Sequence, residues 1–260
     1  LLAEFHRKGI LYKGHKVLPY CPRCGTPLSS HEVGLGFKDV QDPSVFVRFR
    51  ALDAAGNELP EAFLVWTTTP WTLPSNVALA VHPEVDYVKV RLADAGGKQE
   101  VLWLAEARLA ALKAKPEQVQ VLERAKGAAL VGRRYRRLLD LYDVTPTPNA
   151  FTVRPATFVT TEDGSGVVHM APAYGEDDAS VGRRDGLPTL HPVDASGRFV
   201  AGARAGLVAG KPVKEADKDV LRFLKEQGLL FRQETLVHSY PHCWRCDTAL
   251  LYYARDSWYL

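Results

Sequence analysis

In AFLVWTTTPWTLPSN, residues 62–76, an apolar run meets three adjacent threonines, a proline and a second tryptophan. The run AFLVW predicts a buried strand, because valine and aromatic residues favour strands. Pro70 has no N–H group and therefore ends the hydrogen-bond ladder of that strand. Thr67, Thr68 and Thr69 are then expected at a strand terminus, where their hydroxyls face a cavity or solvent. Threonine also favours strands in general, so an ordinary exposed strand end is the more common explanation of this stretch when it is taken alone.

Short strand-like segments recur on both sides of this stretch. They are rich in valine and aromatic residues and lie at 44–52, 77–82, 86–93, 99–105, 151–159 and 166–171. Residues 44–52 alternate between apolar residues on one face and a more polar face with two arginines, which predicts a sheet with one wetter side. Helices are expected at 105–115 and 213–228, the second ending at Gly228 as a C-cap. The pattern predicts an α+β fold with a barrel-like sheet and peripheral helices.

The composition is that of a globular chain. Of the 260 residues, 46% are hydrophobic and 24% are charged, and the formal charge of +3 does not favour a general nucleic-acid coat. No apolar run approaches the roughly 20 residues of a membrane-spanning helix, and no signal-peptide pattern is present. No GxGxxG, Walker or HExxH motif occurs, so dinucleotide, P-loop and metalloprotease chemistry lack support. The chain starts at Leu1 and its only methionine is Met170, so we expect a piece of a larger protein.

All four cysteines fall into two CxxC pairs near opposite ends of the chain. The segments CPRCGTPL at 21–28 and CWRCDTAL at 243–250 share the form Cys-x-Arg-Cys-x-Thr-x-Leu, which is an internal repeat. Two such turns complete the tetrahedral four-thiolate shell that is typical of structural zinc. The alternative, two redox or disulfide CxxC motifs, requires a thioredoxin-like strand-to-helix setting that neither segment shows. One structural Zn²⁺ is therefore predicted, with the ligands Cys21, Cys24, Cys243 and Cys246.

A second segment with chemical character is EDGSGVVHMAPAYGEDDASVG, residues 162–182. It combines a glycine-rich turn, a strand that ends at His169 and an acidic cluster, Glu176, Asp177 and Asp178, that opens a predicted helix. Acidic residues in a first helical turn commonly only complement the helix dipole. A histidine at a strand end is commonly a packed or hydrogen-bonded residue. Each feature alone therefore has an ordinary structural explanation.

Taken together, these motifs resemble the insertion called connective peptide 1 of bacterial-type isoleucyl-tRNA synthetases. The resemblance covers essentially the whole chain and rests on five motifs in the same order: YCPRCGTPLS, WTTTPWTLPSN, GSGVVHMAPAYGEDD, HCWRCDTAL and SWYL. In the related valyl and leucyl enzymes the threonine motif typically continues Thr-Thr-Arg-Pro, so Thr69 and Trp71 favour the isoleucyl branch. In that family the insertion is an editing domain of a cytoplasmic enzyme, and it hydrolyses valine wrongly attached to the isoleucine tRNA.

An isoleucyl enzyme needs such a second site because isoleucine and valine differ by one methylene group. A hydrophobic pocket cannot strongly reject the smaller side chain, so a single binding site discriminates poorly between the two amino acids. A small editing pocket separates the two by exclusion, since valine fits and the extra methyl group of isoleucine collides with the wall. Such a pocket requires an anion for the α-ammonium group, hydroxyls or amides around the ester, a bulky wall and a water molecule.

The resemblance implies roles for individual residues in binding and hydrolysis. Asp178 lies nine residues beyond His169, as in the family motif, and is similar to the carboxylate that anchors the α-ammonium group. Thr67, Thr68 and Thr69 look like the hydroxyl platform that holds the adenosine end, the ester and a water molecule. Adjacent hydroxyls can form hydrogen bonds with a polar substrate from several directions.

Three further assignments follow from the same resemblance. Asn76 resembles the other polar contact of the family, and Trp66 and His169 are candidates for the wall that measures side-chain size. His169 as a general base is a weaker option. The family is thought to activate water by positioning, with help from the terminal ribose of the tRNA. No nucleophilic triad is recognisable in the sequence.

The partner that the resemblance implies is the single-stranded 3′ end of an aminoacylated isoleucine tRNA, with valyl-adenylate as a further possible substrate. Basic residues at 133–137 and 183–184 are candidates for phosphate contacts, although a charge run is usually a solvated face. No HIGH-type or KMSKS-type signature occurs, so synthetic activity is predicted to be absent. We expect a monomer that makes no membrane contact and relies on the rest of the synthetase for most tRNA contacts.

The predicted modules are an editing domain at 41–232 and a zinc-binding module whose two halves are 1–40 and 233–260. Two alternative functions stay open. One is a non-catalytic zinc-stabilised module that binds and positions the aminoacylated tRNA 3′ end, and the other is a purely structural spacer. The first predicts binding of a valyl-adenosine analogue without turnover of Val-tRNA, and the second predicts no binding of that analogue.

Overall fold

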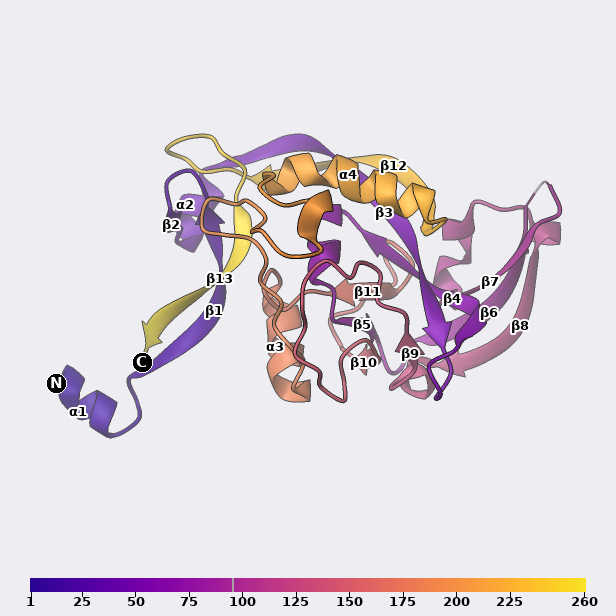
Figure 1. The fold of residues 1–260 in the computed structure, drawn as a ribbon, viewed down its shortest axis with the longest axis horizontal. Helices are drawn as coiled ribbons and strands as arrows, with labels where there is room; N and C mark the ends of the chain where they lie inside the picture. The colour runs from indigo at the N-terminus through magenta and orange to yellow at the C-terminus, as the bar shows by residue number, and fades with distance from the viewer. Residues whose placement is uncertain (95) are drawn as a thin grey trace.

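The computed structural model describes residues 1–94 and 96–260, and its main feature is a curled sheet with helices packed on it (Figure 1). Within the described residues the sheet has ten strands: β3 (Phe37–Leu52), β4 (Glu58–Thr67), β5 (Ala78–Val81), β6 (Asp86–Ala93), β7 (Gln99–Ala105), β8 (Val119–Lys126), β9 (Arg134–Tyr135), β10 (Val153–Pro155), β11 (Val167–Met170) and β12 (Leu230–Pro241). The path through it is β10-β5-β11-β4-β7-β6-β8, and β3 pairs with β4, β9 and β12. Strand β4 is parallel to both β7 and β11.

Apolar side chains cover both faces of this sheet. In β3, Val45, Val47 and Phe49 are fully buried in the larger core, whereas Phe46 lies in a second core and Arg48 is half-buried. The alternation predicted for residues 44–52 is therefore observed. Helix α4 (Val213–Glu226) covers the larger core with apolar residues at helical spacing: Val213, Ala216, Val220 and Leu224.

The remaining helical segments are short. They are α1 (Leu2–Arg7), α2 (Ser30–Gly34), α3 (Glu176–Asp185) and the 3₁₀ segments η1 (Pro70–Ser75), η2 (Glu106–Leu112), η3 (Pro116–Gln118), η4 (Gly127–Leu130) and η5 (Ala205–Leu207). Across residues 1–94 and 96–260, no helix has both the length and the apolar character needed to span a membrane.

The two predicted helices have different outcomes. The helix predicted over 213–228 is confirmed as α4, and Gly228 follows it with a φ of 64°. The α-helix predicted over 105–115 is wrong, because the chain forms the 3₁₀ segment η2 with non-helical backbone at Arg108 and a left-handed Lys113. Only Ala111 and Leu112 are buried there, so no apolar face stabilises a continuous α-helix.

The chain ends form a second, smaller sheet. Strand β1 (Tyr12–Cys21) pairs antiparallel with β13 (Leu251–Tyr259) along its length and with β2 (Thr26–Pro27) at its end. This pairing places both termini at the same side of the molecule (Figure 1). The predicted α+β fold, with a curved sheet and a small module formed by the chain ends, is confirmed. The predicted boundaries at 40/41 and 232/233 fall inside β3 and β12, and the division into modules stays a prediction.

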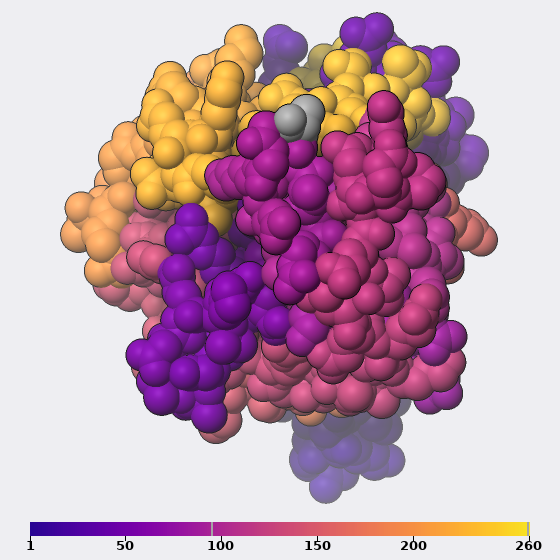
Figure 2. Space-filling view, turned by 90° about the vertical axis from the view of Figure 1, so that its right-hand side faces the viewer, coloured from indigo at the N-terminus to yellow at the C-terminus, as the bar shows by residue number. Residues whose placement is uncertain are grey.

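The long strands β3 and β12 connect the two parts. They pair antiparallel from Leu230 opposite Val47 to Pro241 opposite Phe37. Figure 2 shows the face where the β3–β4 hairpin, in violet, approaches the α4–β12 segment, in gold. The backbone bond from the Arg48 N–H to the Leu229 carbonyl, 2.8 Å, joins these segments directly. The end of α4 is therefore fixed to the sheet.

Candidate functional site

The candidate site is a cavity of about 260 Å³ at the ends of β4 and β11. Its lining comes from β4, η1, β11, the start of α3 and the segments that join them: Trp66, Thr67, Thr68, Thr69, Thr72, Val168, His169, Ala171, Tyr174 and Asp178. It brings together the threonine run and the 162–182 segment, which lie about a hundred residues apart in the sequence.

 Seven residues besides the cysteines were predicted for the site, and six of them line this cavity: Trp66, Thr67, Thr68, Thr69, His169 and Asp178.

The pairing of β4 with β11 explains why the two motifs meet. Val168 lies opposite Trp66 in a parallel bridge, so the next residues, Thr67 and His169, are neighbours at the ends of the two strands. The Thr67 Oγ1 and His169 Nε2 atoms are 3.4 Å apart. Pro70 then starts η1, which turns the chain away from the sheet.

The threonine hydroxyls form a connected network with His169. Thr69 Oγ1 lies 3.3 Å from both Thr67 Oγ1 and Thr72 Oγ1, and the Thr69 N–H donates to Thr67 Oγ1 at 3.1 Å. Thr72 Oγ1 donates to the Thr69 carbonyl at 2.8 Å and lies 3.0 Å from His169 Nε2. Several hydroxyls are thus held in fixed positions around one cavity.

His169 is a buried, neutral imidazole. Burial lowers the pKa of His169 to about 4, so the ring is uncharged at neutral pH. Because the Thr72 hydroxyl proton points to the Thr69 carbonyl, the short contact assigns the ring proton to Nε2. Within the described residues Nδ1 has no hydrogen-bond partner. A ring with this pKa is a weak base, and its position suits a wall better than proton transfer.

Asp178 supplies a carboxylate to the same cavity. It lies in the first turn of α3, and its Oδ2 accepts a 2.8 Å hydrogen bond from the Ala171 N–H. Burial raises the pKa of Asp178 to about 6, the Ala171 hydrogen bond opposes this rise, and the charge of Asp177 adds to it. Gly175 leaves the necessary room, because a Cβ there would lie 2.8 Å from the Asp178 carboxyl carbon. No ion pair of Asp178 occurs in the described part of the chain, so the carboxylate can receive a cationic ligand group.

Trp66 and Asn76 have different surroundings. Trp66 lines the cavity, and its indole N–H donates to Ser44 Oγ at 2.6 Å. Asn76 lies outside the cavity lining and is buried in the core. Its amide donates to the Ala78 carbonyl at 2.9 Å and accepts from the Tyr135 hydroxyl at 2.7 Å. These bonds give Asn76 a structural role, and its substrate contact stays a prediction.

The cavity contains residues that the sequence did not single out: Thr72, Val168, Ala171 and Tyr174. Thr72 follows Thr69 by three residues, and residues three apart are eclipsed in a 3₁₀ segment, so its hydroxyl joins the platform. The spacing Thr-x-x-Thr predicts that the two hydroxyls lie close together only if a 3₁₀ turn is also predicted there. Tyr174 packs edge-on against Trp71, with ring centroids 5.0 Å apart.

The four cysteines form a second candidate site. Their sulfur atoms all lie within 4.8 Å of one another, with Cys21 and Cys246 3.4 Å apart and Cys24 and Cys243 3.9 Å apart. Tetrahedral Zn–S bonds of about 2.3 Å place sulfurs about 3.8 Å apart, so the cluster has the dimensions of a metal site. The two turns also match locally, since Gly25 and Asp247 both have a left-handed backbone, with φ of 70° and 64°.

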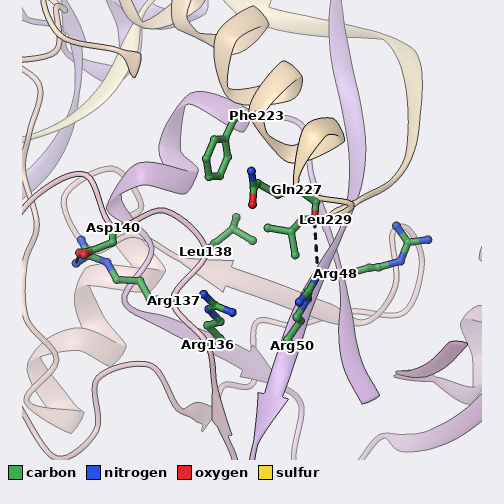
Figure 3. Close-up of a pocket in the computed structure, with 9 residues that line it drawn as sticks. All are labelled: Arg48, Arg50, Arg136, Arg137, Leu138, Asp140, Phe223, Gln227 and Leu229. Atoms are coloured by element: carbon green, nitrogen blue, oxygen red, sulfur yellow. Dashed lines mark hydrogen bonds and ion pairs between the residues drawn. The ribbon is translucent and has the colours of Figure 1, made fainter. Parts of the chain in front are cut away.

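A further hollow of about 450 Å³ lies between β3, the 136–140 segment and the end of α4 (Figure 3). Its lining is Arg48, Arg50, Arg136, Arg137, Leu138, Asp140, Phe223, Gln227 and Leu229. The guanidinium groups pair with carboxylates: Arg48 with Glu100, Arg50 and Arg136 with Glu58, and Arg137 with Asp140. A phosphate would compete with these carboxylates, and the phosphate contacts of residues 133–137 stay a prediction.

Known proteins resemble this chain over its whole length. The family model described as tRNA synthetases class I (I, L, M and V) matches residues 1–260. The isoleucine–tRNA ligase of Clostridium tetani is 47% identical over 259 residues, which is 100% of this chain and 24% of that protein. Isoleucine–tRNA ligase 2 of Bacillus cereus is 47% identical over 258 residues, 99% of this chain and 23% of that protein. The chain thus spans about a quarter of the length of these relatives.

Two solved structures share the fold. The editing domain of the P. knowlesi cytosolic leucyl-tRNA synthetase has a TM-score of 0.55 at 13% identity, covering 78% of this chain and 98% of that one. The GlLeuRS-CP1 structure has a TM-score of 0.55 at 14% identity, covering 76% and 100%. The resemblance drawn from the sequence motifs is confirmed, and the chain belongs to the class I tRNA synthetases of the isoleucine, leucine, methionine and valine group.

Proposed function

We propose that this chain is an editing hydrolase that cleaves valine from mischarged Val-tRNA(Ile) and excludes isoleucine by size. The observation that carries the proposal is the small cavity in which a set of fixed hydroxyls meets a carboxylate that has no ion-pair partner among the described residues. Aminoacyl esters carry an ammonium group next to a polar ester, and this cavity offers a partner for each. The partner is the 3′ end of the aminoacylated isoleucine tRNA, with valyl-adenylate as a second possible substrate.

The chemistry relies on positioning. Asp178 holds the α-ammonium group, and the hydroxyls of Thr67, Thr68 and Thr69 hold the ester, the adenosine and a water molecule. The water oxygen then bonds to the ester carbonyl carbon, the bond from that carbon to the ribose oxygen breaks, and the ribose oxygen leaves as a hydroxyl with a proton from the water. Fixed hydroxyl dipoles stabilise the charge that develops on the carbonyl oxygen. Because His169 is a weak base, orientation of the water is the main contribution of the protein.

The size sieve follows from the wall of the cavity. Val168, His169 and Trp66 lie beside the threonines and the carboxylate, so they border the space next to a substrate held by its amino group. One additional methylene group changes the free energy of binding in an apolar pocket by about 1–3 kcal/mol when it fits, and a collision adds a steric penalty. Valine is then accepted and isoleucine rejected.

Deacylation assays test this function. The chain at high concentration is expected to release valine from Val-tRNA(Ile) and to leave Ile-tRNA(Ile) intact. Binding of a non-hydrolysable valyl-adenosine analogue without any turnover would instead support a module that only positions the tRNA end. Absence of both binding and turnover in a folded sample would support a structural spacer.

Binding of the amino group is expected to depend on pH. The pair needs an ionised Asp178, whose pKa is about 6, and a protonated α-amino group, whose pKa is about 7.7–8.0. Affinity for the valyl-adenosine analogue should therefore fall below pH 6 as Asp178 takes up a proton, and above pH 8 as the ammonium loses one. Titration calorimetry between pH 5 and 9 measures this profile. An Asp178→Asn variant should lose the acidic limb, and a flat wild-type profile would contradict the assignment.

We also propose that Cys21, Cys24, Cys243 and Cys246 bind one Zn²⁺ that holds the chain ends together. A closed four-thiolate shell leaves no position for water, so the ion stabilises structure and takes no part in hydrolysis. Removal by a chelator is expected to loosen β1 and β13 while the deacylation rate stays within about twofold. Metal analysis and amide exchange measure these effects. Loss of hydrolysis in a domain that stays folded would indicate a catalytic ion instead.

A bacterial cytoplasmic enzyme is the setting that we propose for this domain, with the chain itself monomeric. The relatives that match over the whole chain are bacterial proteins, which supports the bacterial setting. Light scattering of the purified chain tests the monomeric state. The remaining body of the synthetase is proposed to supply most tRNA contacts.

A further inference from the structure

The start of η1 presents an unusual hydrogen-bond arrangement. A helical segment begins with N–H groups that have no partner in the preceding turn. In η1 the first residue, Pro70, has no N–H, and the N–H of Thr72 donates to the Thr69 carbonyl at 3.0 Å. The N–H of Trp71 is therefore the donor that needs a partner from elsewhere.

The residue best placed for this task by sequence is Thr69. It occupies the N-cap position, where threonine commonly accepts a hydrogen bond from the following backbone. In the described structure, however, the Thr69 side chain makes no capping bond. Its hydroxyl instead lies between Thr67 Oγ1 and Thr72 Oγ1 in the cavity. The Thr69 hydroxyl therefore takes part in the hydroxyl network of the cavity and does not cap η1.

Asp217 is a candidate for the missing cap. It lies in α4, which packs against η1, and it is only 6% exposed. Its carboxylate lies near the Trp71 N–H, and this backbone donor lowers the pKa of the carboxyl group. Its Oδ1 atom has no hydrogen-bond partner among the described residues, so ordinary core packing does not explain a carboxylate at this position. Burial raises the pKa of Asp217 to about 7, with Lys214 opposing the rise, so a neutral amide is a close mimic of this group.

We infer that Asp217 is a positioning residue, which caps η1 from α4 and thereby leaves the Thr69 hydroxyl free to face the substrate. The inference rests on the proposed editing function for its catalytic consequence. If Asp217 is lost, the Thr69 side chain can rotate to cap Trp71, and the cavity loses a hydroxyl. Loss of Asp217 then lowers the rate of hydrolysis because the Thr69 hydroxyl moves, and not because the fold is less stable.

A double-mutant cycle tests this route. Asp217→Ala is expected to lower kcat for Val-tRNA(Ile) about tenfold, and Asp217→Asn to restore it, because the amide oxygen still accepts from Trp71. In a Thr69→Val background the Asp217→Ala change should have little further effect, since the hydroxyl is already absent. The inference is overturned if the fall in kcat of the double variant is the product of the two single falls, or if Asp217→Ala has the wild-type kcat. Val220→Ala, which removes buried packing from the same helix, is the control and should leave kcat within about twofold.

Amide exchange of Trp71 gives a readout that needs no hydrolysis. The Trp71 N–H is expected to be protected in the wild type and in Asp217→Asn, and to exchange at least tenfold faster in the Asp217→Ala, Thr69→Val double variant. Asp217→Ala alone should lie between them, because Thr69 can take over. Equal protection in all variants would overturn the capping role. If the wild type does not hydrolyse Val-tRNA(Ile) but the variants show this exchange pattern, the proposed editing function is wrong and the capping role of Asp217 is supported.

Discussion

Replacement of Asp178 by alanine is expected to remove nearly all hydrolysis of Val-tRNA(Ile). The change deletes the carboxylate that the cavity offers to the α-ammonium group and leaves that cation without a partner. Loss of one member of a buried charge pair costs about 2–5 kcal/mol, which corresponds to a fall of roughly 30-fold to several thousand-fold. Single-turnover deacylation of Val-tRNA(Ile) measures the effect on kcat/KM.

Two matched variants distinguish the effect of the Asp178 charge from effects on the local structure. Asp178→Asn keeps an oxygen for the Ala171 N–H and removes only the charge, so its activity should fall nearly as far. Asp177→Ala removes the neighbouring, exposed carboxylate outside the cavity lining and should retain activity within about twofold. An active Asp178→Asn variant would show that the charge is not required.

The second large effect is expected at the wall of the cavity. His169→Ala should allow hydrolysis of Ile-tRNA(Ile), because removal of the ring opens space beside Val168 and Thr67. A pocket that accepts the extra methylene group loses a discrimination worth about 1–3 kcal/mol, so the ratio of valine to isoleucine hydrolysis should fall about 10-fold to 200-fold. The ratio of the two rates in one preparation is the proper measurement, since it does not depend on the fraction of folded protein.

The histidine at position 191 provides the control for this experiment. His191 is half-buried and packs on Tyr174 and Tyr253, but it lies outside the cavity lining. His191→Ala should therefore keep the wild-type ratio. If His169→Ala also keeps it, the wall lies elsewhere, with Trp66 and Tyr174 the next candidates.

Local sequence patterns located several strands of the larger sheet. Valine-rich alternation identified β3 and β4, and Pro70 marked the point at which the ladder stops, because each of these signals acts within a few residues. The repeated knuckle motif predicted that Cys21 and Cys243 come together. The threonine run was expected at a strand end that faces a cavity or solvent, and it lines a cavity.

What the sequence could not predict depends on contacts between distant segments. Asn76 forms its hydrogen bonds with Tyr135, far along the chain, so its burial was invisible in the WTTTPWTLPSN motif. Thr72 joins the site only because a 3₁₀ turn follows Pro70. Residues 105–115 have good helical composition, but little of that segment is buried, and packing decides its conformation.

The parallel bridge between Val168 and Trp66 also has a consequence for folding. It joins residues about a hundred positions apart, and it is what places His169 beside the threonines. Such non-local parallel contacts form slowly, because a long loop must close before they are made. Local hairpins such as β6–β7 can therefore form while the candidate cavity does not yet exist. A refolding chain should recover most of its strand signal before it recovers the ability to bind a valyl ester.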